Sequence, residues 1–178
     1  MNNAFLDLIR TRRSIRFYQP EQIGDDELAT VLDAGTYAPT GHGLQDPWIV
    51  AVQNPDLRRR LSQLNASFIE PRPDYDPYYG APTVVLVFCS SPEKCKTGQA
   101  DGALVLGTMM LAAHAIGLGT CWINREREMF DTDEGRALMA EMGLPEGLVG
   151  VGALSLGHIA KGPKPNKPRK ENYYRVVK

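Results

Sequence analysis

The sequence predicts an α+β fold that is built around one long buried helix and ends in an extended tail. Residues 98–117 are apolar on nearly every side, a pattern that requires a helix to be buried all round, in the core or in a subunit interface. Two apolar runs rich in β-branched residues, at 48–52 and 83–89, are typical of strands. Prolines alternate with basic and polar residues from 161 to 170, so this segment is expected to lie extended across a surface.

The first half of the chain predicts three helices, two before the strand at 48–52 and one after it. Apolar periodicity places the helices near residues 5–9, 25–38 and 55–65. Gly24 or Asp25 can cap the second helix, and Pro39 stops it. The polar, glycine-containing loop 40–47 then leads into the strand at 48–52, which is expected to be buried.

A loop or lid, two further strands and one further helix complete the predicted order. Residues 70–80 contain three prolines and three tyrosines and cannot form a regular element. The long helix ends at the two glycines that flank Leu118. The remaining elements are expected as a strand at 120–123, a helix at 132–142 and a strand at 148–156.

Length and charge indicate a single domain, residues 1–178, without a general affinity for polyanions. A chain of 178 residues suits one domain with a full core. Its 21 acidic and 20 basic residues nearly balance, so no overall field points to nucleic acid or to an anionic membrane. The first residues lack a secretory signal, and no apolar run approaches the ~20 residues of a membrane span. The protein is therefore expected to be soluble and cytoplasmic.

The cysteines and histidines predict neither a disulfide framework nor a metal site. The odd set Cys89, Cys95 and Cys121 lacks zinc-ligand pairing, so free thiols in a reducing compartment are expected. Cys89 and Cys121 lie in apolar strands, where a thiol tends to be inert. Cys95 lies between two lysines in a segment that is typical of an exposed surface loop. The histidines are scattered and have no second ligand at metal-binding spacing.

A cluster of guanidinium groups around a hydroxyl follows the first helix. It consists of Arg12, Arg13, Ser14 and Arg16. Because an arginine fork matches phosphate oxygens two at a time and serine adds a hydroxyl donor, the cluster predicts a phosphate site without a glycine-rich loop. The alternative is a solvated basic turn that complements the dipole of the preceding helix.

Five motifs, in this order along the chain, resemble those of the FMN-dependent nitroreductase family. They lie at 12–17, 38–48, 79–82, 111–123, and 154–158 with the basic stretch 164–169. Together they span almost the whole chain. The resemblance implies a nitroreductase-like central sheet, mixed or antiparallel, that is flanked by helices, and an enzyme with bound FMN.

The resemblance also implies which residues contact the FMN. The cofactor-binding positions that it implies are Arg12, Arg13, Ser14, Arg16, Pro39, Thr40, Gly41, Gly43, Gln45, Trp122, Ile123, Asn124, Gly157, Lys167 and Arg169. The N-terminal cluster would hold the phosphate and the ribityl chain, and Lys167 and Arg169 would close on the phosphate from the other end of the chain. The turn at 122–124 would pack against the ring system, with Gln45 at a polar edge and Gly157 allowing close backbone approach.

The loop 39–41 corresponds to one that, in this family, reaches across a two-fold axis to the neighbouring subunit's flavin. The resemblance therefore implies a homodimer with shared FMN sites. Plainer alternatives stay open: the loop can be an ordinary helix-stop turn, and Lys167 and Arg169 can belong to a solvated tail. Trp122 can be a core residue, and His158 a structural histidine.

Two positions depart from the family pattern. Gly43 stands where the family commonly has asparagine, and Asp46 is an extra residue between Gln45 and Pro47. The departures predict that one flavin hydrogen bond is lost. They also suggest that a carboxylate near the ring lowers the flavin potential, unless Asp46 points to solvent.

The function implied by the resemblance is that of an FMN-dependent oxidoreductase that uses NAD(P)H to reduce electron-poor acceptors such as nitroaromatics and quinones, by a ping-pong hydride transfer. No Gly-x-Gly-x-x-Gly motif follows a strand, so NAD(P)H is expected to visit as a substrate. The flavin supplies the chemistry, so no side chain is expected as an obligatory acid or base. Tyr75, Tyr78 and Tyr79 are predicted to line the acceptor pocket. Two alternatives stay open: a flavin-binding redox sensor or accessory protein without robust turnover, and a specialised reductase or dehydrogenase on the same fold.

Overall fold

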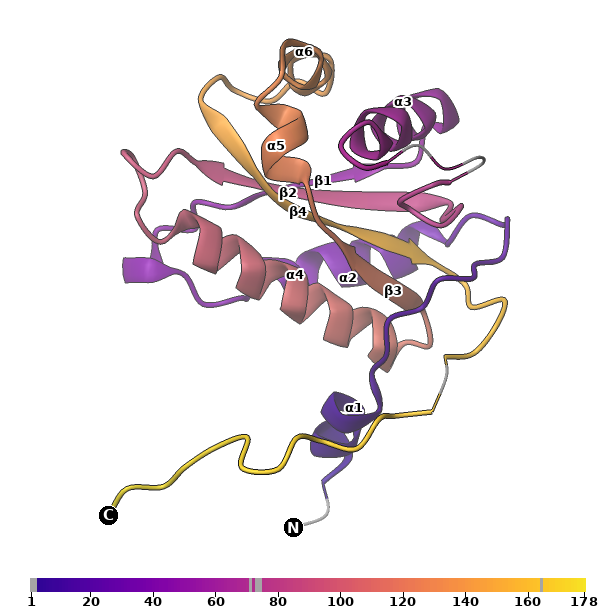
Figure 1. The fold of residues 1–178 in the computed structure, drawn as a ribbon, viewed down its shortest axis with the longest axis vertical. Helices are drawn as coiled ribbons and strands as arrows, with labels where there is room; N and C mark the ends of the chain where they lie inside the picture. The colour runs from indigo at the N-terminus through magenta and orange to yellow at the C-terminus, as the bar shows by residue number, and fades with distance from the viewer. Residues whose placement is uncertain (1–2, 71, 73–74, 164) are drawn as a thin grey trace.

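The computed structural model describes residues 3–70, 72, 75–163 and 165–178. Its helices are α1 (Ala4–Thr11), α2 (Asp25–Thr36), α3 (Pro55–Ala66), α4 (Gly98–Ala115), α5 (Glu126–Phe130) and α6 (Asp133–Glu141), with a 3₁₀ turn at Gly41–Gly43. Its strands are β1 (Trp48–Val52), β2 (Thr83–Ser90), β3 (Gly119–Ile123) and β4 (Leu148–Gly157). Each predicted helix and strand is present close to its expected bounds, which confirms the α+β prediction (Figure 1). The loop predicted at 70–80 includes residues 71, 73 and 74, which lie outside the described residues.

The four strands form one sheet in the order β1-β2-β4-β3, and all three pairings are antiparallel. Of the two predicted forms of the sheet, the antiparallel one is therefore observed. The central strands β2 and β4 are buried over most of their length. The prediction of a buried strand at 48–52 is wrong in part, because β1 is an edge strand with a neighbour on one side only. Its first residue, Trp48, keeps 47% of its surface exposed.

Helices cover both faces of the sheet. In Figure 1, α3, α5 and α6 lie on one face, and α2 and α4 lie on the other. Successive side chains of β2 alternate between the two layers: Leu86 and Phe88 pack below α3, α5 and α6, whereas Val85 and Val87 pack against α2 and α4. A strand that is buried on both faces has no need of polar positions, which explains its unbroken apolar run.

The long helix α4 is buried on one face and open on the other. Its inner face packs against the sheet and α2 through residues that include Val105, Leu106, Met109 and Ala113. Its outer face, which we term the α4 stripe, consists of Leu104, Gly107, Thr108, Leu111 and Ala115, all at least partly exposed. Leu104 keeps 47% of its surface exposed. The prediction that α4 is buried on all sides within one chain is therefore wrong. Of the two predicted environments, a subunit interface stays the prediction for the stripe.

The sequence patterns did not predict α5. Its five residues are too few to show a helical period. The helix begins after Arg125, a non-glycine residue in the left-handed region with φ of 85°. Gly150 of β4 makes this approach possible, because a Cβ there would overlap the backbone carbonyl group of Glu126. Tertiary packing, and not local propensity, therefore determines α5.

The helix α1 stands apart from the body of the fold, and the C-terminal tail runs beside it (Figure 1). Asn3 caps the helix by accepting a hydrogen bond from the Phe5 amide at 2.9 Å. No residue of α1 is buried, and Phe5 and Ile9 are exposed. The described residues of 161–170 form no helix or strand, as predicted, and a turn follows at 171–172. The two terminal segments thus lie side by side, outside the helices that cover the sheet.

Candidate functional site

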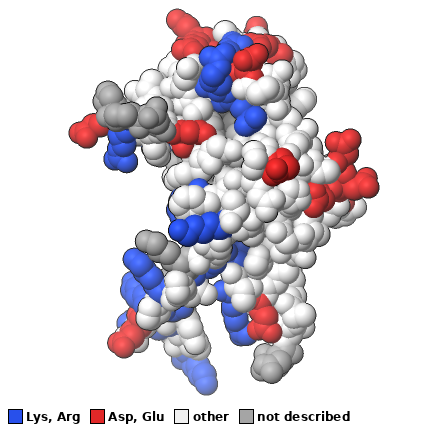
Figure 2. All heavy atoms as spheres, turned by 90° about the vertical axis from the view of Figure 1, so that its right-hand side faces the viewer, with Lys and Arg blue, Asp and Glu red and all other residues white. Residues whose placement is uncertain are grey.

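The arginine cluster forms one wall of a basic hollow, which we call the cradle. The cradle has a volume of about 750 Å³ and is lined by residues 12–17, 161–163, 165–167 and 169. The Ile15 amide donates to the Thr120 carbonyl at 2.9 Å, so this wall runs alongside the start of β3. Figure 2 shows Lys and Arg side chains gathered in the lower half of this face, on both sides of a deep hollow. The predicted phosphate residues from the two ends of the chain therefore meet.

The cradle holds positive charge that lacks a partner. Arg12 Nη1 is buried and makes no hydrogen bond with any described residue. Burial lowers the pKa of Arg12, and the guanidinium groups of Arg13 and Arg169 lower it further. Buried donors in native proteins are nearly always paired. A bound anion would pair this one and would relieve the repulsion among the three arginines.

The turn before β2 orients the side chain of Arg16. Its Nε donates to the Tyr79 hydroxyl at 3.3 Å, and its guanidinium lies 5.6 Å from the centre of the Tyr79 ring. The Tyr79 hydroxyl raises the pKa of Arg16 by accepting this bond. Tyr79 itself is in the left-handed region, with φ of 59°. Asp76 pins the turn, because its carboxylate accepts from the amides of Tyr78 at 2.8 Å and Gly80 at 2.6 Å.

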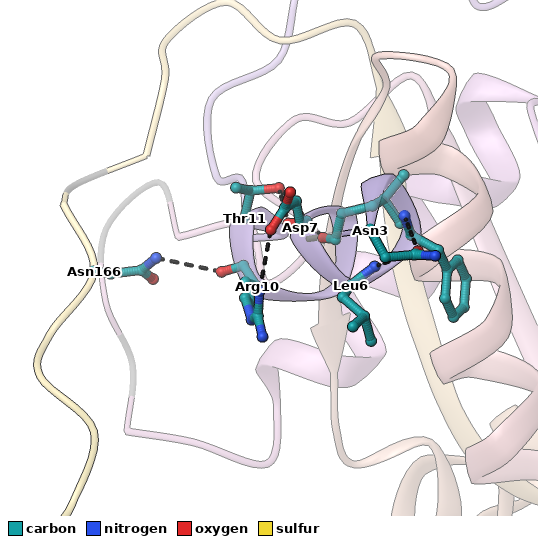
Figure 3. Close-up of polar contacts among 8 residues, drawn as sticks. Asn3, Leu6, Asp7, Arg10, Thr11 and Asn166 are labelled. Atoms are coloured by element: carbon teal, nitrogen blue, oxygen red, sulfur yellow. Dashed lines mark hydrogen bonds and ion pairs between the residues drawn. The ribbon is translucent and has the colours of Figure 1, made fainter. Parts of the chain in front are cut away.

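The tail forms the second wall of the cradle. Lys167 and Arg169 are exposed and line the hollow opposite the arginine cluster. Asn166 donates to the Arg10 carbonyl at 3.4 Å and so ties the tail to the end of α1 (Figure 3). Lys161 lies 5.4 Å from the centre of the Phe17 ring. The tail therefore touches the N-terminal segment at two points, with the predicted ligands beyond them.

Several hydrogen bonds hold the loop at 39–46 within its own chain. The Gly41 amide donates to both oxygens of Asp101 at 3.1 Å, and Thr97 Oγ1 donates to Asp101 Oδ2 at 2.9 Å. The Gln45 amide donates to Thr40 Oγ1 at 3.0 Å. These bonds place the loop against the first turns of α4.

This loop also has an unusual backbone. His42, Gly43 and Gln45 all lie in the left-handed region, with φ of 53°, 67° and 51°. Glycine adopts this region without steric cost, which gives a structural reason for Gly43. Asp46 is half-buried and accepts a hydrogen bond from the Ser90 amide at 2.9 Å. The alternative that Asp46 points to solvent is therefore wrong.

The cradle and this loop lie at opposite ends of α4. Asp101, which holds the loop, is in the first turn of the helix, whereas His114 Nε2 lies 3.0 Å from Thr11 Oγ1 at the last turn. The 18 residues of α4 span about 27 Å at 1.5 Å per residue. Within one chain, the structure therefore does not bring 39–45 to the cradle.

The turn after β3 lies nearer to the cradle, because β3 begins beside it. Trp122 Nε1 donates to Asn124 Oδ1 at 2.7 Å. Trp122 also packs against the apolar core cluster around α4, which fits the alternative that it is a core residue. Ile123 is buried, whereas Asn124 is exposed. A side chain at Gly157 would meet Pro82 Cδ at 2.8 Å, so packing alone requires a glycine there. His158 lies 3.7 Å from Glu27 in a partly exposed pair, which fits a structural role.

Several residues near this turn had no signal in the sequence patterns. Tyr78 is only 2% exposed, and its hydroxyl donates to Glu126 Oε1 at 3.2 Å. The prediction that Tyr78 lines an acceptor pocket is therefore wrong, because its side chain fills the core. Glu126 is equally buried, and burial raises its pKa to about 8. A glutamate in the polar stretch 124–128 is typical of an exposed helix, so its burial could not be predicted.

The thiols match the sequence prediction except in one respect. All three cysteines are free, and burial raises the pKa of Cys89 to about 11 and also raises that of Cys121. Cys95 is buried, so the prediction of an exposed loop is wrong for its side chain. No group of three or more potential metal ligands occurs among the described residues. The described helices include none that is long and apolar enough to cross a bilayer.

Comparisons with known proteins show which sequences and folds this chain resembles. The sequence profile of the nitroreductase family matches residues 9–158. A nitroreductase with bound FMN from Bacteroides fragilis superposes with a TM-score of 0.90 at 31% identity, covering 99% of this chain and 100% of that one. An FMN-dependent nitroreductase from Clostridium difficile R20291 has a TM-score of 0.80 at 26% identity, with all of both chains covered. The NADPH-flavin oxidoreductase of Vibrio harveyi is 28% identical over an alignment of 187 positions that covers 95% of this chain and 70% of that protein.

Proposed function

The chain belongs to the nitroreductase family, and we propose that it binds FMN and transfers electrons from NAD(P)H to small electron-poor acceptors. The observation that carries the proposal is the cradle, where a buried Arg12 donor has no partner among the described residues and three arginines repel one another. An FMN phosphate supplies the two charges and the oxygen acceptors that this hollow lacks. The whole chain, residues 1–178, would act as one FMN-binding domain.

The residues present fit the cofactor. The proposed phosphate and ribityl ligands are Arg12, Arg13, Ser14, Arg16, Lys167 and Arg169. Planar guanidinium forks on one wall and a lysine and an arginine on the other would neutralise a dianion from two sides. The proposed contacts of the ring system are Trp122, Ile123, Asn124 and Gly157 from the same chain, and Pro39, Thr40, Gly41, Gly43 and Gln45 from a second copy.

A homodimer is part of this proposal. The loop at 39–45 and the cradle lie at opposite ends of α4, which is about 27 Å long, so the loop cannot reach the cofactor of its own chain. The α4 stripe is apolar or small along its length, and small residues such as Gly107 and Ala115 allow two helices to approach closely. Two copies packed through antiparallel α4 stripes would bring the loop of each to the cradle of the other, which completes two sites.

We propose the reaction from the groups that this chain provides to bind FMN and its substrates. When bound, FMN accepts and donates a hydride equivalent, the chemistry that the described side chains cannot supply. The cradle fixes the cofactor at one end, and the turn at 122–124 orients it at the other. NAD(P)H and the acceptor, a nitroaromatic or a quinone, would occupy one place in turn, which gives a ping-pong order. Tyr79 and Tyr75, both partly exposed, stay candidates for the acceptor wall.

The direct test is the visible spectrum of the purified protein, followed anaerobically after addition of NADH or NADPH. We expect a flavin spectrum that bleaches with at least one nucleotide and recovers with a quinone or a nitroaromatic. A flavin that binds but resists both nucleotides would favour a sensor, or a reductase with a protein donor. A protein that cannot bind FMN would contradict the proposal.

A further inference from the structure

A buried polar cluster lies beneath the turn that follows β3. It joins Asn65 of α3, Tyr78 of the turn before β2, and Glu126 at the start of α5. Asn65 and Glu126 are 0% and 1% exposed. Buried polar side chains of this kind are rarely neutral in their effect, because each lost bond leaves a group that water cannot reach. The cluster has no part in the chemistry proposed above, so another role is needed to explain it.

Asn65 is the centre of the cluster and contacts three consecutive residues. Its Nδ2 donates to the Asn124 carbonyl at 2.9 Å and to Glu126 Oε1 at 3.3 Å. Its Oδ1 accepts from Arg125 Nε at 3.1 Å. One side chain on α3 thus contacts each residue of the 124–126 turn, through one backbone carbonyl and two side chains.

Glu126 in turn holds Asn65. Its Oε1 accepts from Asn65 and from the Tyr78 hydroxyl, which lies 3.2 Å away, whereas its buried Oε2 has no partner among the described residues. Burial raises the pKa of the carboxyl to about 8, so at neutral pH it is mostly uncharged. Glu126 therefore acts as a hydrogen-bonding group and not as a charge.

The turn that this cluster holds is under constraint from both sides. Arg125 is in the left-handed region with φ of 85°, a conformation that a non-glycine residue keeps only when its surroundings impose it. On the side of β4, Gly150 leaves no space between the strand and the Glu126 backbone. On the outer side, Asn124 Oδ1 accepts from Trp122 Nε1 at 2.7 Å. The backbone of Asn124 is therefore fixed between the buried cluster and the surface where we place the flavin.

We propose that Glu126, acting through Asn65, is a positioning residue for the flavin, which holds the 124–126 turn in the conformation that meets the ring system. This inference rests on the proposed function and adds residues that do not contact the cofactor. It separates two roles that a buried glutamate can have. If packing matters, leucine can replace it; if its hydrogen bonds matter, only glutamine can.

Ionisation gives a second, independent signature. The ionisable groups that act on Glu126 are Tyr78 from the turn before β2, and Arg125 and Glu128 from its own segment. Asn65 of α3, Met129 and the Gly150 backbone add no charge. Above a pH of about 8 the carboxyl becomes charged, and its unpartnered Oε2 then requires a donor. Arg125 is a cation that acts on this carboxyl, so ionisation is expected to draw it from Asn65 and to loosen the turn.

The experiment measures FMN dissociation constants for wild-type protein and four variants: Glu126→Gln, Glu126→Leu, Asn65→Ala, and Leu64→Ala as a control. Leu64 is the buried neighbour of Asn65 on α3 and packs in the same core, so Leu64→Ala lowers stability without touching the turn. At pH 7 we expect Glu126→Leu and Asn65→Ala to weaken FMN binding by about 10-fold, and Glu126→Gln to stay within about 2-fold of wild type. Asn65→Ala carries the test alone if Glu126→Leu does not fold.

Two further readouts accompany the affinities. Between about pH 6 and about pH 10, wild-type affinity for FMN should fall with a midpoint near 8, and that of Glu126→Gln should not show this step. In the FMN-free proteins, amide exchange at 123–125 should be faster in Asn65→Ala than in Leu64→Ala.

Either of two results would overturn the inference. One is FMN binding by Glu126→Leu and Asn65→Ala that is no weaker than FMN binding by Leu64→Ala. The other is an FMN affinity that depends on pH in Glu126→Gln as it does in the wild-type protein. Both presuppose that wild-type protein binds FMN, and failure of that binding would instead overturn the proposed function.

Discussion

The cradle and the loop at 39–46 lie at opposite ends of α4 and differ in how far their hydrogen bonding is complete. In the loop, the Gly41 and Gln45 amides have partners, and Asp46 accepts from the β2 backbone. In the cradle, a buried donor of Arg12 has none among the described residues, and neighbouring arginines repel it. These groups of the loop thus have partners without a ligand, whereas the buried Arg12 donor of the cradle has none among the described residues.

This difference indicates what each region adds to a binding site. A preorganised loop loses little entropy when a ligand arrives, so it contributes shape at low cost. A cluster of unpaired cations is strained until an anion binds, so it contributes affinity. A site that needs both must join the two ends of α4, and one copy of the chain cannot do so.

The largest expected effect comes from breaking the dimer that would join them. Leu111→Glu places a charge in the middle of the α4 stripe, and two copies would face each other with like charges. We expect a monomer by light scattering and loss of measurable FMN binding. Phe68→Glu is the control, because Phe68 is an exposed apolar residue that lies beyond α3, away from the stripe. A dimer that survives Leu111→Glu would remove the stripe from the interface.

The next effect is on the cradle. Arg12→Ala removes charge-assisted hydrogen bonds worth about 1.5–3 kcal/mol, so the FMN dissociation constant should rise about 10- to 100-fold. Arg59→Ala is the matched control, since Arg59 is exposed on α3 and pairs with Asp56. Titration of the FMN-free protein by flavin fluorescence measures both. Equal affinities for the two variants would mean that the cradle does not bind the phosphate.

A smaller effect is expected at the loop. Asp101→Asn keeps one acceptor oxygen for Gly41 but loses the second, and it disturbs the Thr97 bond as well. We expect a loss of about 1–2 kcal/mol in the free energy of unfolding and a modest loss of FMN affinity. Asp56→Asn, on the exposed face of α3, should change neither. If Asp101→Asn weakened FMN more than Arg12→Ala, the assigned roles of the two regions would be reversed.

The smallest effect concerns Asp46. Its carboxylate is bound to the Ser90 amide, a bond that an asparagine oxygen can also accept. Asp46→Asn should therefore leave the fold intact and raise the flavin midpoint potential slightly, because a negative charge disfavours the anionic reduced flavin. Spectroelectrochemistry of the FMN-loaded protein measures it. An unchanged potential would mean that Asp46 has only its structural role.

The parts of the fold that sequence patterns predicted are those with long, uniform signals. The runs at 48–52 and 83–89 became β1 and β2, and the apolar stretch at 98–117 became α4. The exposure of the α4 stripe could not be predicted from the sequence. Apolar residues indicate that a surface is covered, but not whether the same chain or a second subunit covers it. The five residues of α5 carry no period, and packing against Gly150 determines them.

The site divides in the same way. The cluster of cations around Arg12 is visible in the sequence, and the cradle brings it to Lys167 and Arg169, while the role of these residues as ligands stays a prediction. The burial of Tyr78 and Glu126 could not be predicted, because a polar residue in a loop and one in a charged stretch are both expected at the surface. Their burial is a tertiary effect: Glu126 meets Asn65, which lies 61 residues away in the sequence.

The most direct test of a site shared between two copies is complementation in mixed dimers. One chain carries Arg12→Ala with Arg13→Ala, and the other carries Gly41→Val, whose Cβ would overlap Thr97. Each variant alone should lack high-affinity FMN sites. Heterodimers isolated with two different affinity tags should regain one such site per dimer, because the intact cradle of the second chain meets the intact loop of the first. Heterodimers with no high-affinity site would contradict the account, since every site would then be built from a single chain.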